Sequence, residues 1–412
     1  MTPSIETRTS WIVASLSLVI LGVSFGAAWI GVVALKAIAA ETGGARSVPA
    51  LATSLAWFGS GIGGIAMGYI AERIGVRWTV TFGVTMMGLG LAISSYGQDV
   101  FGTAGALYIG HGLFMGLLGN SGLNAPLYVY VSRWFDRRRG SALALIASGQ
   151  YISGAIWPPI FEYTVAAYGW RQTMLTFGIF VVAVVVPIAL VVLRKPPEVA
   201  PPPLPAAPGA VRPTVLGWPP NLVFAMMAAA SFFCCVPMAM PQTHLVALCS
   251  DLGIKPTHGA AMLSMLLAIA FLSRQMWGWI SDRIGGLITV LAGSMWQFFS
   301  IIALALTQDE IGLFTVTAIF GLGFSGIIPA YVLAVRELFP AHQAGWRVPV
   351  LLCLTAFGMA SGGWFAGMLY DYFGYYAPAF AAGLIFNLVN LVLIGTLVAR
   401  RGGWFGPRVA YG

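Results

Sequence analysis

Charged residues are scarce in this chain of 412 residues, and acids are the scarcest, with 13 Asp and Glu against 21 Lys and Arg. Charged residues make up 8% of the sequence and hydrophobic residues 58%, whereas a soluble domain carries about 25% charged residues. A protein whose whole surface faces water is therefore excluded. The net charge of +8 does not indicate nucleic acid, because the basic residues follow a membrane-topology pattern.

Cysteine and histidine are equally sparse, with four of each. Cys234, Cys235, Cys249 and Cys353 lie in or beside apolar runs without paired metal-ligand spacing, so we expect small core residues and no metal or cofactor. No His, Asp, Glu or Cys grouping at membrane depth supplies a nucleophile–base pair or a metal cluster, so an enzyme is not predicted. The tails and the central linker are too short for the soluble signalling domain of a sensor.

Apolar runs of helix-spanning length recur from end to end, and each of about 20 residues is long enough to cross a bilayer. Because they are continuous rather than alternating, they predict an all-α integral membrane bundle rather than a barrel. The first run, from Trp11, is too long for a cleavable signal peptide. Twelve transmembrane helices are predicted at 11–38, 50–71, 78–97, 102–131, 141–166, 171–193, 219–249, 258–280, 287–307, 311–337, 347–369 and 376–399.

The longest polar interruption contains KPPEVAPPPLPAAPG, and its proline density predicts an extended linker without a core. It divides the chain into a six-helix half at 1–193, a cytoplasmic linker at 194–218, a second six-helix half at 219–400 and a cytoplasmic tail at 401–412. Two six-helix pseudo-repeats around a central site are the architecture of alternating-access carriers.

The basic residues set the predicted orientation. With the N-terminus in the cytoplasm, sixteen Lys and Arg fall on the cytoplasmic side, against Arg46, Arg171 and Lys255 on the other. This is a strong positive-inside bias, and it places both termini in the cytoplasm. Lys36 lies within the first span near its outer end, where we expect its side chain to reach toward the interface.

Two glycine-spaced acid–arginine segments, 210 residues apart, form the clearest internal repeat. Each follows the cytoplasmic end of a span, where its charges can hold one conformation together and separate in another; plain turn and anchor charges remain the alternative. We name these segments the cytoplasmic hinges. Their predicted latch residues are Gly68, Glu72, Arg73, Gly75 and Arg77 in the first half, and Gly278, Asp282, Arg283 and Gly285 in the second.

These hinges resemble the Gly-x-x-x-Asp-Arg-x-Gly-x-Arg loop of the major facilitator superfamily, with Glu72 in place of Asp. Within that superfamily the sequence is most similar to the monocarboxylate transporter and oxalate–formate antiporter branch. The segment from Trp134 to Ala142, Pro126 late in the fourth span and Arg274 in the eighth span carry this narrower resemblance. The resemblance implies the major facilitator fold and pairing of Arg274 with a substrate carboxylate; the alternative is that Arg274 snorkels or pairs within the protein.

The departures from that branch affect the cargo and the coupling. Trp29 stands where some members carry a first-span lysine, and Thr355 falls near the second cation of the oxalate carriers. One buried cation in place of two favours a monocarboxylate. Ala270 replaces the aspartate that mammalian-type members place four residues before the arginine, so coupling must use histidine, the proton of the substrate or exchange of anions.

The remaining polar residues within spans are candidate cavity residues. His244 and His111 are proton-coupling candidates because histidine titrates near neutral pH, although a lone membrane histidine more often bonds a neighbouring helix. Asn120 and Asn124 share a helix face because they are four residues apart. The predicted substrate-binding residues are Arg274, Tyr331, Asn124, Asn120, Gln150, Tyr151 and Trp29, the last as an apolar wall; helix–helix bonding is the alternative for the polar ones.

The sequence thus predicts a secondary carrier in the cytoplasmic (inner) membrane of a bacterium. It would move a small organic anion by alternating access, coupled to protons or to a counter-anion, and it would need no partner chain, so we expect a monomer surrounded by lipid. The alternative is an efflux carrier of the same fold for a drug-like or neutral apolar compound. A cationic drug is disfavoured because Arg274 would repel it.

Overall fold

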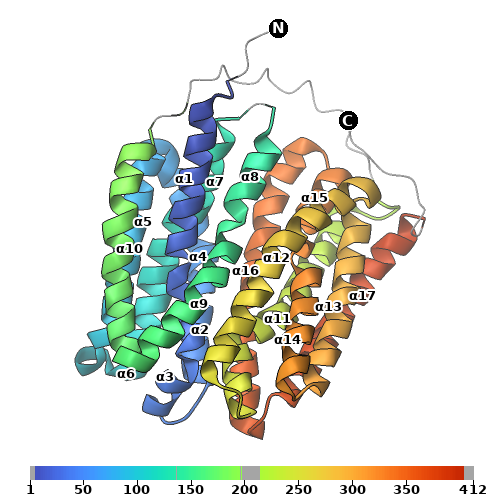
Figure 1. Ribbon diagram of the computed structural model, residues 1–412. Helices are drawn as coiled ribbons and strands as arrows, with labels where there is room; N and C mark the ends of the chain where they lie inside the picture. The colour runs from blue at the N-terminus through green and yellow to red at the C-terminus, as the bar shows by residue number, and fades with distance from the viewer. Residues whose placement is uncertain (1–4, 136, 195, 197–213, 403–412) are drawn as a thin grey trace.

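The computed structural model describes residues 5–135, 137–194, 196 and 214–402. Asp136, most of the predicted linker at 194–218 and most of the predicted tail at 401–412 lie outside the described residues. Within the described part, helices are joined by short connections, and the single β-bridge joins Val215 and Trp218. The predicted all-α fold is therefore confirmed (Figure 1).

The first half of the chain folds into a bundle whose described helices pack mainly on one another. Three of the predicted spans are each divided into two or three consecutive helices. In chain order the helices are α1 (Arg8–Ser24), α2 (Gly26–Val33), α3 (Leu35–Glu41), α4 (Ser47–Ile74), α5 (Val76–Tyr96), α6 (Gln98–Tyr108), η1 (Ile109–Asn120), α7 (Ser121–Ser132), α8 (Arg139–Ala147), α9 (Gly149–Tyr168) and α10 (Trp170–Val192).

The second half forms the other bundle, which lies beside the first in Figure 1. Its helices are longer on average, and α11 and α16 continue through internal prolines. In chain order they are α11 (Pro220–Asp251), α12 (Pro256–Ile284), α13 (Gly286–Leu306), α14 (Glu310–Phe324), α15 (Ile327–Leu338), α16 (Ala341–Phe373) and α17 (Ala377–Arg400).

Eleven helical stretches of the described chain are long and apolar enough to cross a membrane. The stretch that falls outside this number is α8 with α9, which corresponds to the predicted span at 141–166. The protein is therefore a multi-pass membrane protein. The count of twelve and the cytoplasmic position of the termini stay predictions, and we use "cytoplasmic end" for the end where α1 begins and "outer end" for the opposite one.

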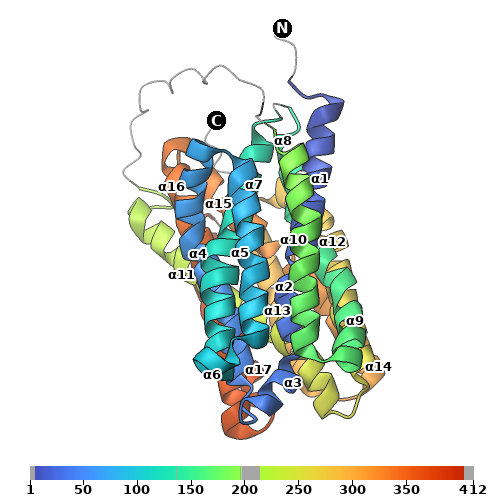
Figure 2. The same ribbon diagram turned by 90° about the vertical axis from the view of Figure 1, so that its left-hand side faces the viewer.

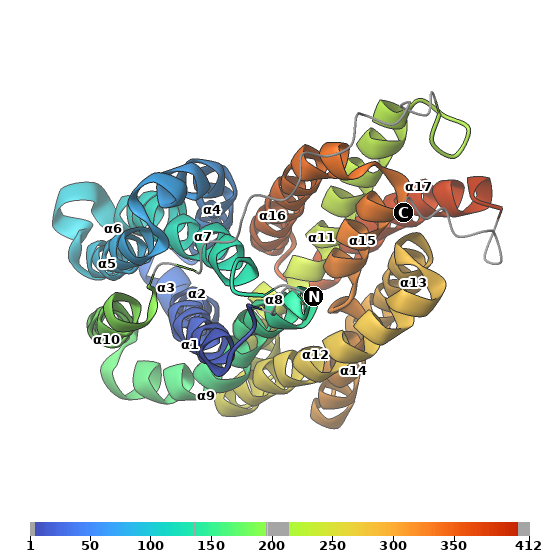
Figure 3. The same cartoon turned by 90° about the horizontal axis from the view of Figure 1, so that it is seen from above.

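Four helix pairs bring the two bundles together. The first-half helices α4 and α9 pack against α16 and α12, respectively, and α2 and α3 both pack against α11. Figure 3 shows α9 beside α12 when the molecule is seen from the cytoplasmic end, and Figure 2 shows the first bundle from its own side. Residues that point inward from these helices are therefore the ones that can reach a substrate between the halves.

Candidate functional site

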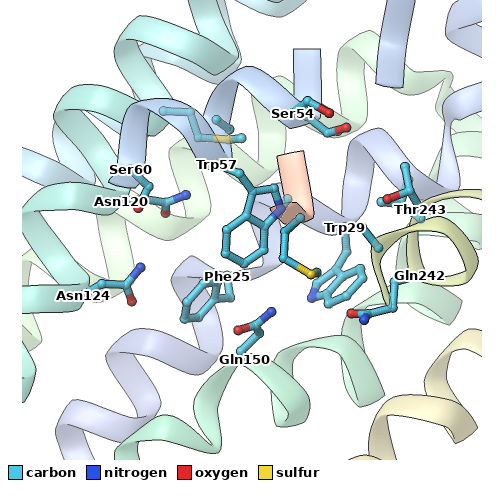
Figure 4. A pocket seen from close by; sticks show the side chains of 17 residues that line it. Phe25, Trp29, Ser54, Trp57, Ser60, Asn120, Asn124, Gln150, Gln242 and Thr243 are labelled. Atoms are coloured by element: carbon cyan, nitrogen blue, oxygen red, sulfur yellow. The ribbon is translucent and has the colours of Figure 1, made fainter. Parts of the chain in front are cut away.

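A small cavity with a volume of about 50 Å³ lies between the two bundles. All 17 residues that line it are uncharged (Figure 4). They are Phe25, Ala28, Trp29, Val32, Thr53, Ser54, Ala56, Trp57, Ser60, Met115, Asn120, Asn124, Gln150, Ala239, Gln242, Thr243 and Met359.

Four of the predicted substrate-binding residues meet in this lining, namely Trp29, Asn120, Asn124 and Gln150. The two asparagines follow from the local winding of their span. Residues Ile109–Asn120 are wound as a π-helix, a form that is frequent at functional sites, and the regular helix α7 resumes at Ser121. The amides of Asn120, Asn124 and Gln150 make no side-chain hydrogen bond with any described residue, so their polar groups are available to a ligand.

Arg274 lies at the interface of α12 with α9, close to the cavity but not in its lining. The central carbon of its guanidinium is 5.3 Å from the ring centroid of Tyr151, which is the residue after Gln150. Its helix is held in place by Ser273, which donates to the carbonyl oxygen of Gly321 at 3.0 Å. None of the ion pairs between described residues involves Arg274, so its charge is half-buried without an acidic partner.

Tyr331, in contrast, is separated from the other candidates. Its side chain is 0% exposed, and its hydroxyl donates to Asn390 Oδ1 at 2.6 Å. This bond joins α15 to α17 inside the second bundle. The structure therefore places Tyr331 in helix packing, and the predicted hydrogen bond from Tyr331 to a substrate stays untested by any bound molecule.

The two candidate coupling histidines occupy different environments. His111 is buried in the first bundle, where its Nδ1 is 3.2 Å from the carbonyl oxygen of Leu107 and 3.0 Å from Ser94 Oγ. His244 is buried at the outer side of the cavity, one residue after Thr243. Its Nε2 is 2.8 Å from the carbonyl oxygen of Gly363, and its Nδ1 is 3.0 Å from the hydroxyl of Tyr376.

His244 is linked through Tyr376 to a group of charged residues that joins the halves at the outer end. We name Lys36, Arg46, Asp251, Asp371 and Tyr376 the outer cluster. Arg46 of the first half donates two hydrogen bonds to Asp251 of the second, from Nη1 to Oδ2 at 2.5 Å and from Nη2 to Oδ1 at 2.6 Å. Lys36 Nζ also reaches Asp251 Oδ1 at 3.0 Å, and Arg46 Nη1 donates to the Tyr376 hydroxyl at 2.7 Å.

The second carboxylate of the outer cluster, Asp371, is bonded to backbone groups. Asp371 accepts hydrogen bonds from the backbone N–H groups of Arg46 at 2.7 Å and Ser47 at 2.9 Å, and it thus caps the first turn of α4, whose amides lack helical partners. The ring of Tyr370 lies 3.6 Å from the Arg46 guanidinium carbon. The outer ends of the two halves are therefore held together in this conformation.

Electrostatics at the cluster favour a fixed charge on Arg46. Burial alone would lower its pKa, but the hydrogen bonds from its guanidinium to Asp251 and Tyr376 and the nearby carboxylate offset burial, so the pKa of Arg46 is raised. Burial raises the pKa of the Tyr376 phenol, so this hydroxyl stays protonated and can donate a hydrogen bond. With Arg46 donating to it, the Tyr376 hydroxyl can donate onward to His244 Nδ1.

The cytoplasmic hinges make contacts within their own halves. Glu72 pairs with Arg133 at 3.2 Å, and Arg77 Nε donates to the carbonyl oxygen of Leu193 at 3.2 Å. Arg283 lies over the Trp279 ring with 3.3 Å from its guanidinium carbon to the centroid. Gly75 and Gly285 both have positive φ angles, 91° and 84°, which explains glycine at these helix ends. The predicted latch between halves is not formed by these contacts and stays a prediction for another conformation.

The outer cluster was not predicted from the sequence, although the positions of its charges indicate it. Lys36 and Arg46 lie at the outer end of the first half, and Asp251 and Asp371 lie at the outer end of the second. Opposite charges on two halves at one membrane surface predict a contact between them. From the sequence, Lys36 was predicted to reach toward the interface and Arg46 to lie on the outer side, and no contact of either with the second half was predicted.

The fold and the cavity between two bundles define a transport protein of the membrane. A sequence profile of the Major Facilitator Superfamily matches residues 16–348. The chain therefore belongs to the Major Facilitator Superfamily, and the family membership predicted from the hinges is confirmed.

Named relatives agree with transport and differ in cargo. Monocarboxylate transporter 13 of Bos taurus is 26% identical over 349 residues, covering 82% of this chain and 77% of the relative. The agnestins efflux protein AgnL12 of Paecilomyces divaricatus is 22% identical, covering 81% of this chain and 75% of the relative. Among solved structures, a bacterial homologue of the human lysosomal transporter Spinster has a TM-score of 0.67 at 14% identity, with 97% of each chain covered, which shows the fold.

Proposed function

We propose that this protein is a secondary carrier that moves a small organic anion, of the monocarboxylate type, across the cytoplasmic membrane of a bacterium by alternating access. The observation that carries the proposal is the half-buried Arg274, which has no acidic partner among the described residues, beside a cavity lined by neutral residues. A half-buried charge within a membrane-spanning helix costs free energy unless a ligand of opposite charge binds to it. A planar guanidinium binds a carboxylate through two parallel hydrogen bonds.

The other candidates take supporting roles in this proposal. Asn124 and Gln150 orient the anion from the cavity wall, and the outer cluster and the cytoplasmic hinges close the two ends alternately. The similarity to monocarboxylate transporter 13 supports the same class of cargo. The neutral lining and the named efflux relative favour the second candidate, export of a neutral apolar compound.

The deciding experiment is uptake of radiolabelled lactate, pyruvate, formate and oxalate into proteoliposomes, with and without an inward proton gradient. Arg274→Gln and Arg274→Lys are compared with wild type, and Arg336→Gln serves as a control because Arg336 is exposed on α15. We expect one monocarboxylate to be taken up and both Arg274 variants to lose uptake, since lysine lacks the two-point geometry. Full transport by Arg274→Gln would exclude the carboxylate role.

Proton coupling is proposed to act through His244. Because the Gly363 carbonyl can only accept, His244 Nε2 carries the hydrogen and the neutral Nδ1 accepts from Tyr376. Protonation of Nδ1 removes that acceptor and forces the Tyr376 hydroxyl, which already accepts from Arg46, to rearrange. A proton on His244 would thus weaken the outer cluster, in which Arg46, Asp251 and Asp371 are the nearby charges.

A further inference from the structure

Trp29 carries an unusual polar atom. Only 6% of its surface is exposed, and its indole Nε1 has no hydrogen-bond partner in the described part of the chain. Several other buried polar atoms share this property, but Trp29 is the one among their residues that lines the cavity. Buried donors without a partner are rare and call for an explanation.

The position of the ring shows where this donor points. Gly154 makes room for it, because a Cβ at that residue would lie 2.9 Å from Trp29 Cζ2 and 3.0 Å from Cε2. The nitrogen-bearing edge of the indole therefore leans on α9 at Gly154. Gln150 lies four residues earlier on the same face of α9, and Figure 4 shows the indole nitrogen on the side of the ring turned toward the middle of the cavity.

We propose that Trp29 Nε1 donates a hydrogen bond to an uncharged acceptor on the cargo, so that the transported acid carries a carbonyl or ether oxygen remote from its carboxylate. This inference rests on the proposed function, in which Arg274 holds the carboxylate. Arg274 meets α9 at Tyr151, and the indole meets α9 at Gly154. These contacts are three residues apart, about 4.5 Å along the helix axis, so the carboxylate and the second acceptor of the cargo would both be bound beside the same turn of α9.

The walls around this donor are aromatic and apolar. Phe25, Trp29 and Trp57 supply aromatic faces, and Met115 and Met359 supply adaptable apolar contacts. Water does not reach Nε1 in this conformation, so the donor stays unpaired until an acceptor on the cargo contacts it. A cargo with that acceptor satisfies the donor, whereas a cargo without one leaves it unpaired, which is how polar sites reject apolar analogues.

A pair of nearly isosteric acids tests the donor. 4-Acetylbenzoate has the carbonyl acceptor, 4-isopropylbenzoate lacks it, and 4-acetylbenzamide lacks the negative charge. Dissociation constants are measured by isothermal titration calorimetry on the full chain in lipid nanodiscs. The variants are Trp29→Phe, which keeps an aromatic ring and removes the N–H, and Trp296→Phe, a matched control outside the lining whose N–H donates to the carbonyl oxygen of Ile319.

We expect the preference of wild type for 4-acetylbenzoate over 4-isopropylbenzoate to fall by about five- to tenfold in Trp29→Phe, the worth of one hydrogen bond, and to be unchanged in Trp296→Phe. An unchanged preference in Trp29→Phe, or no binding of either acetyl compound to wild type, overturns the inference. If Trp29→Phe folds poorly, equal affinity of wild type for the two acids overturns it as well. Tight binding of 4-acetylbenzamide that survives Arg274→Gln would instead remove the anion assignment while leaving the Trp29 donor standing.

Discussion

The outer cluster predicts that a single carboxylate controls the balance between the two access states. Asp251 is the residue at which Arg46 and Lys36 converge. Asp251→Asn keeps the size of the side chain and removes its charge. In the conformation with the outer ends closed, the Arg46 side chain is 7% exposed. The substitution leaves its buried guanidinium without the carboxylate that pairs with it. When the halves separate at the outer end, water can solvate the same guanidinium, so the substitution costs little in that state.

The size of the effect follows from the contacts. Removing one partner of a fully buried ion pair costs about 3–5 kcal/mol. The Asp251 side chain is 23% exposed, and Asn can still accept one of the two hydrogen bonds. We therefore expect Asp251→Asn to destabilise this conformation by about 2 kcal/mol. A difference of that size changes the ratio of the two conformations about 30-fold. Such a shift is sufficient to populate the outward-open state visibly.

Distances between spin labels measure this shift. Cysteines replace Ala40 and Thr257, which are exposed at the outer ends of the two halves. Cys353 is removed because it is only half-buried, whereas the other three native cysteines are buried. Double electron–electron resonance should give a short distance in wild type and an added long-distance population in Asp251→Asn.

A matched control and a second substitution test whether the change in distance comes from the outer cluster. Asp309 lies at the same end of the molecule but caps α14 within one half, accepting from Gly312 N at 2.7 Å, so Asp309→Asn should leave the distances unchanged. Adding Arg46→Gln to Asp251→Asn removes the uncompensated charge and should restore part of the short population. Identical distributions for Asp251→Asn and Asp309→Asn would show that the cluster does not hold the halves together.

Two further predictions concern coupling and the hinge. His244→Gln keeps a hydrogen-bonding side chain but cannot be protonated, so we expect it to abolish proton-driven accumulation of the cargo in liposomes while anion exchange continues; retention of gradient-driven accumulation would contradict the coupling role. Gly285→Ala should lower the melting temperature in detergent, because its φ of 84° and ψ of 162° lie in a region that is essentially restricted to glycine and costs about 1–3 kcal/mol with a side chain, and its Cβ would lie 3.1 Å from Arg401 Nη1. Gly278→Ala, in the same hinge but with open space around its Cβ, should leave that temperature unchanged or raise it, and equal losses for both variants would refute the conformational explanation.

Helices and their polar faces were predictable because local patterns determine them. The spacing of Asn120 and Asn124 places both on one face, and both line the cavity. Arg274 was found by its charge within an apolar run, which costs too much to be placed at random. These signals come from a single span and need no knowledge of its neighbours.

Contacts between distant helices were not predictable in the same way. Tyr331 satisfied the same local criteria as Gln150, but its hydroxyl is taken by Asn390, 59 residues away. Trp29 was predicted as an apolar wall, and its unpaired nitrogen became visible only once Gly154 and Gln150 were placed beside it. The rotation of each helix in the bundle decides such cases, and sequence periodicity is weak where most residues of a helix are apolar.

The two ends of the molecule differ in the strength of their contacts, and this difference sets the resting conformation. At the outer end, a largely buried bidentate pair joins the halves. At the cytoplasmic end, Glu72 pairs with Arg133 inside one half, with side chains 59% and 50% exposed, and such an exposed pair contributes at most about 1 kcal/mol. Freeing Glu72 for a contact across the halves therefore costs little. We therefore expect the outer cluster to supply much of the energy difference between the access states, and substitutions of His244 and Asp251, which act on it, to have the largest effects on coupling and conformation.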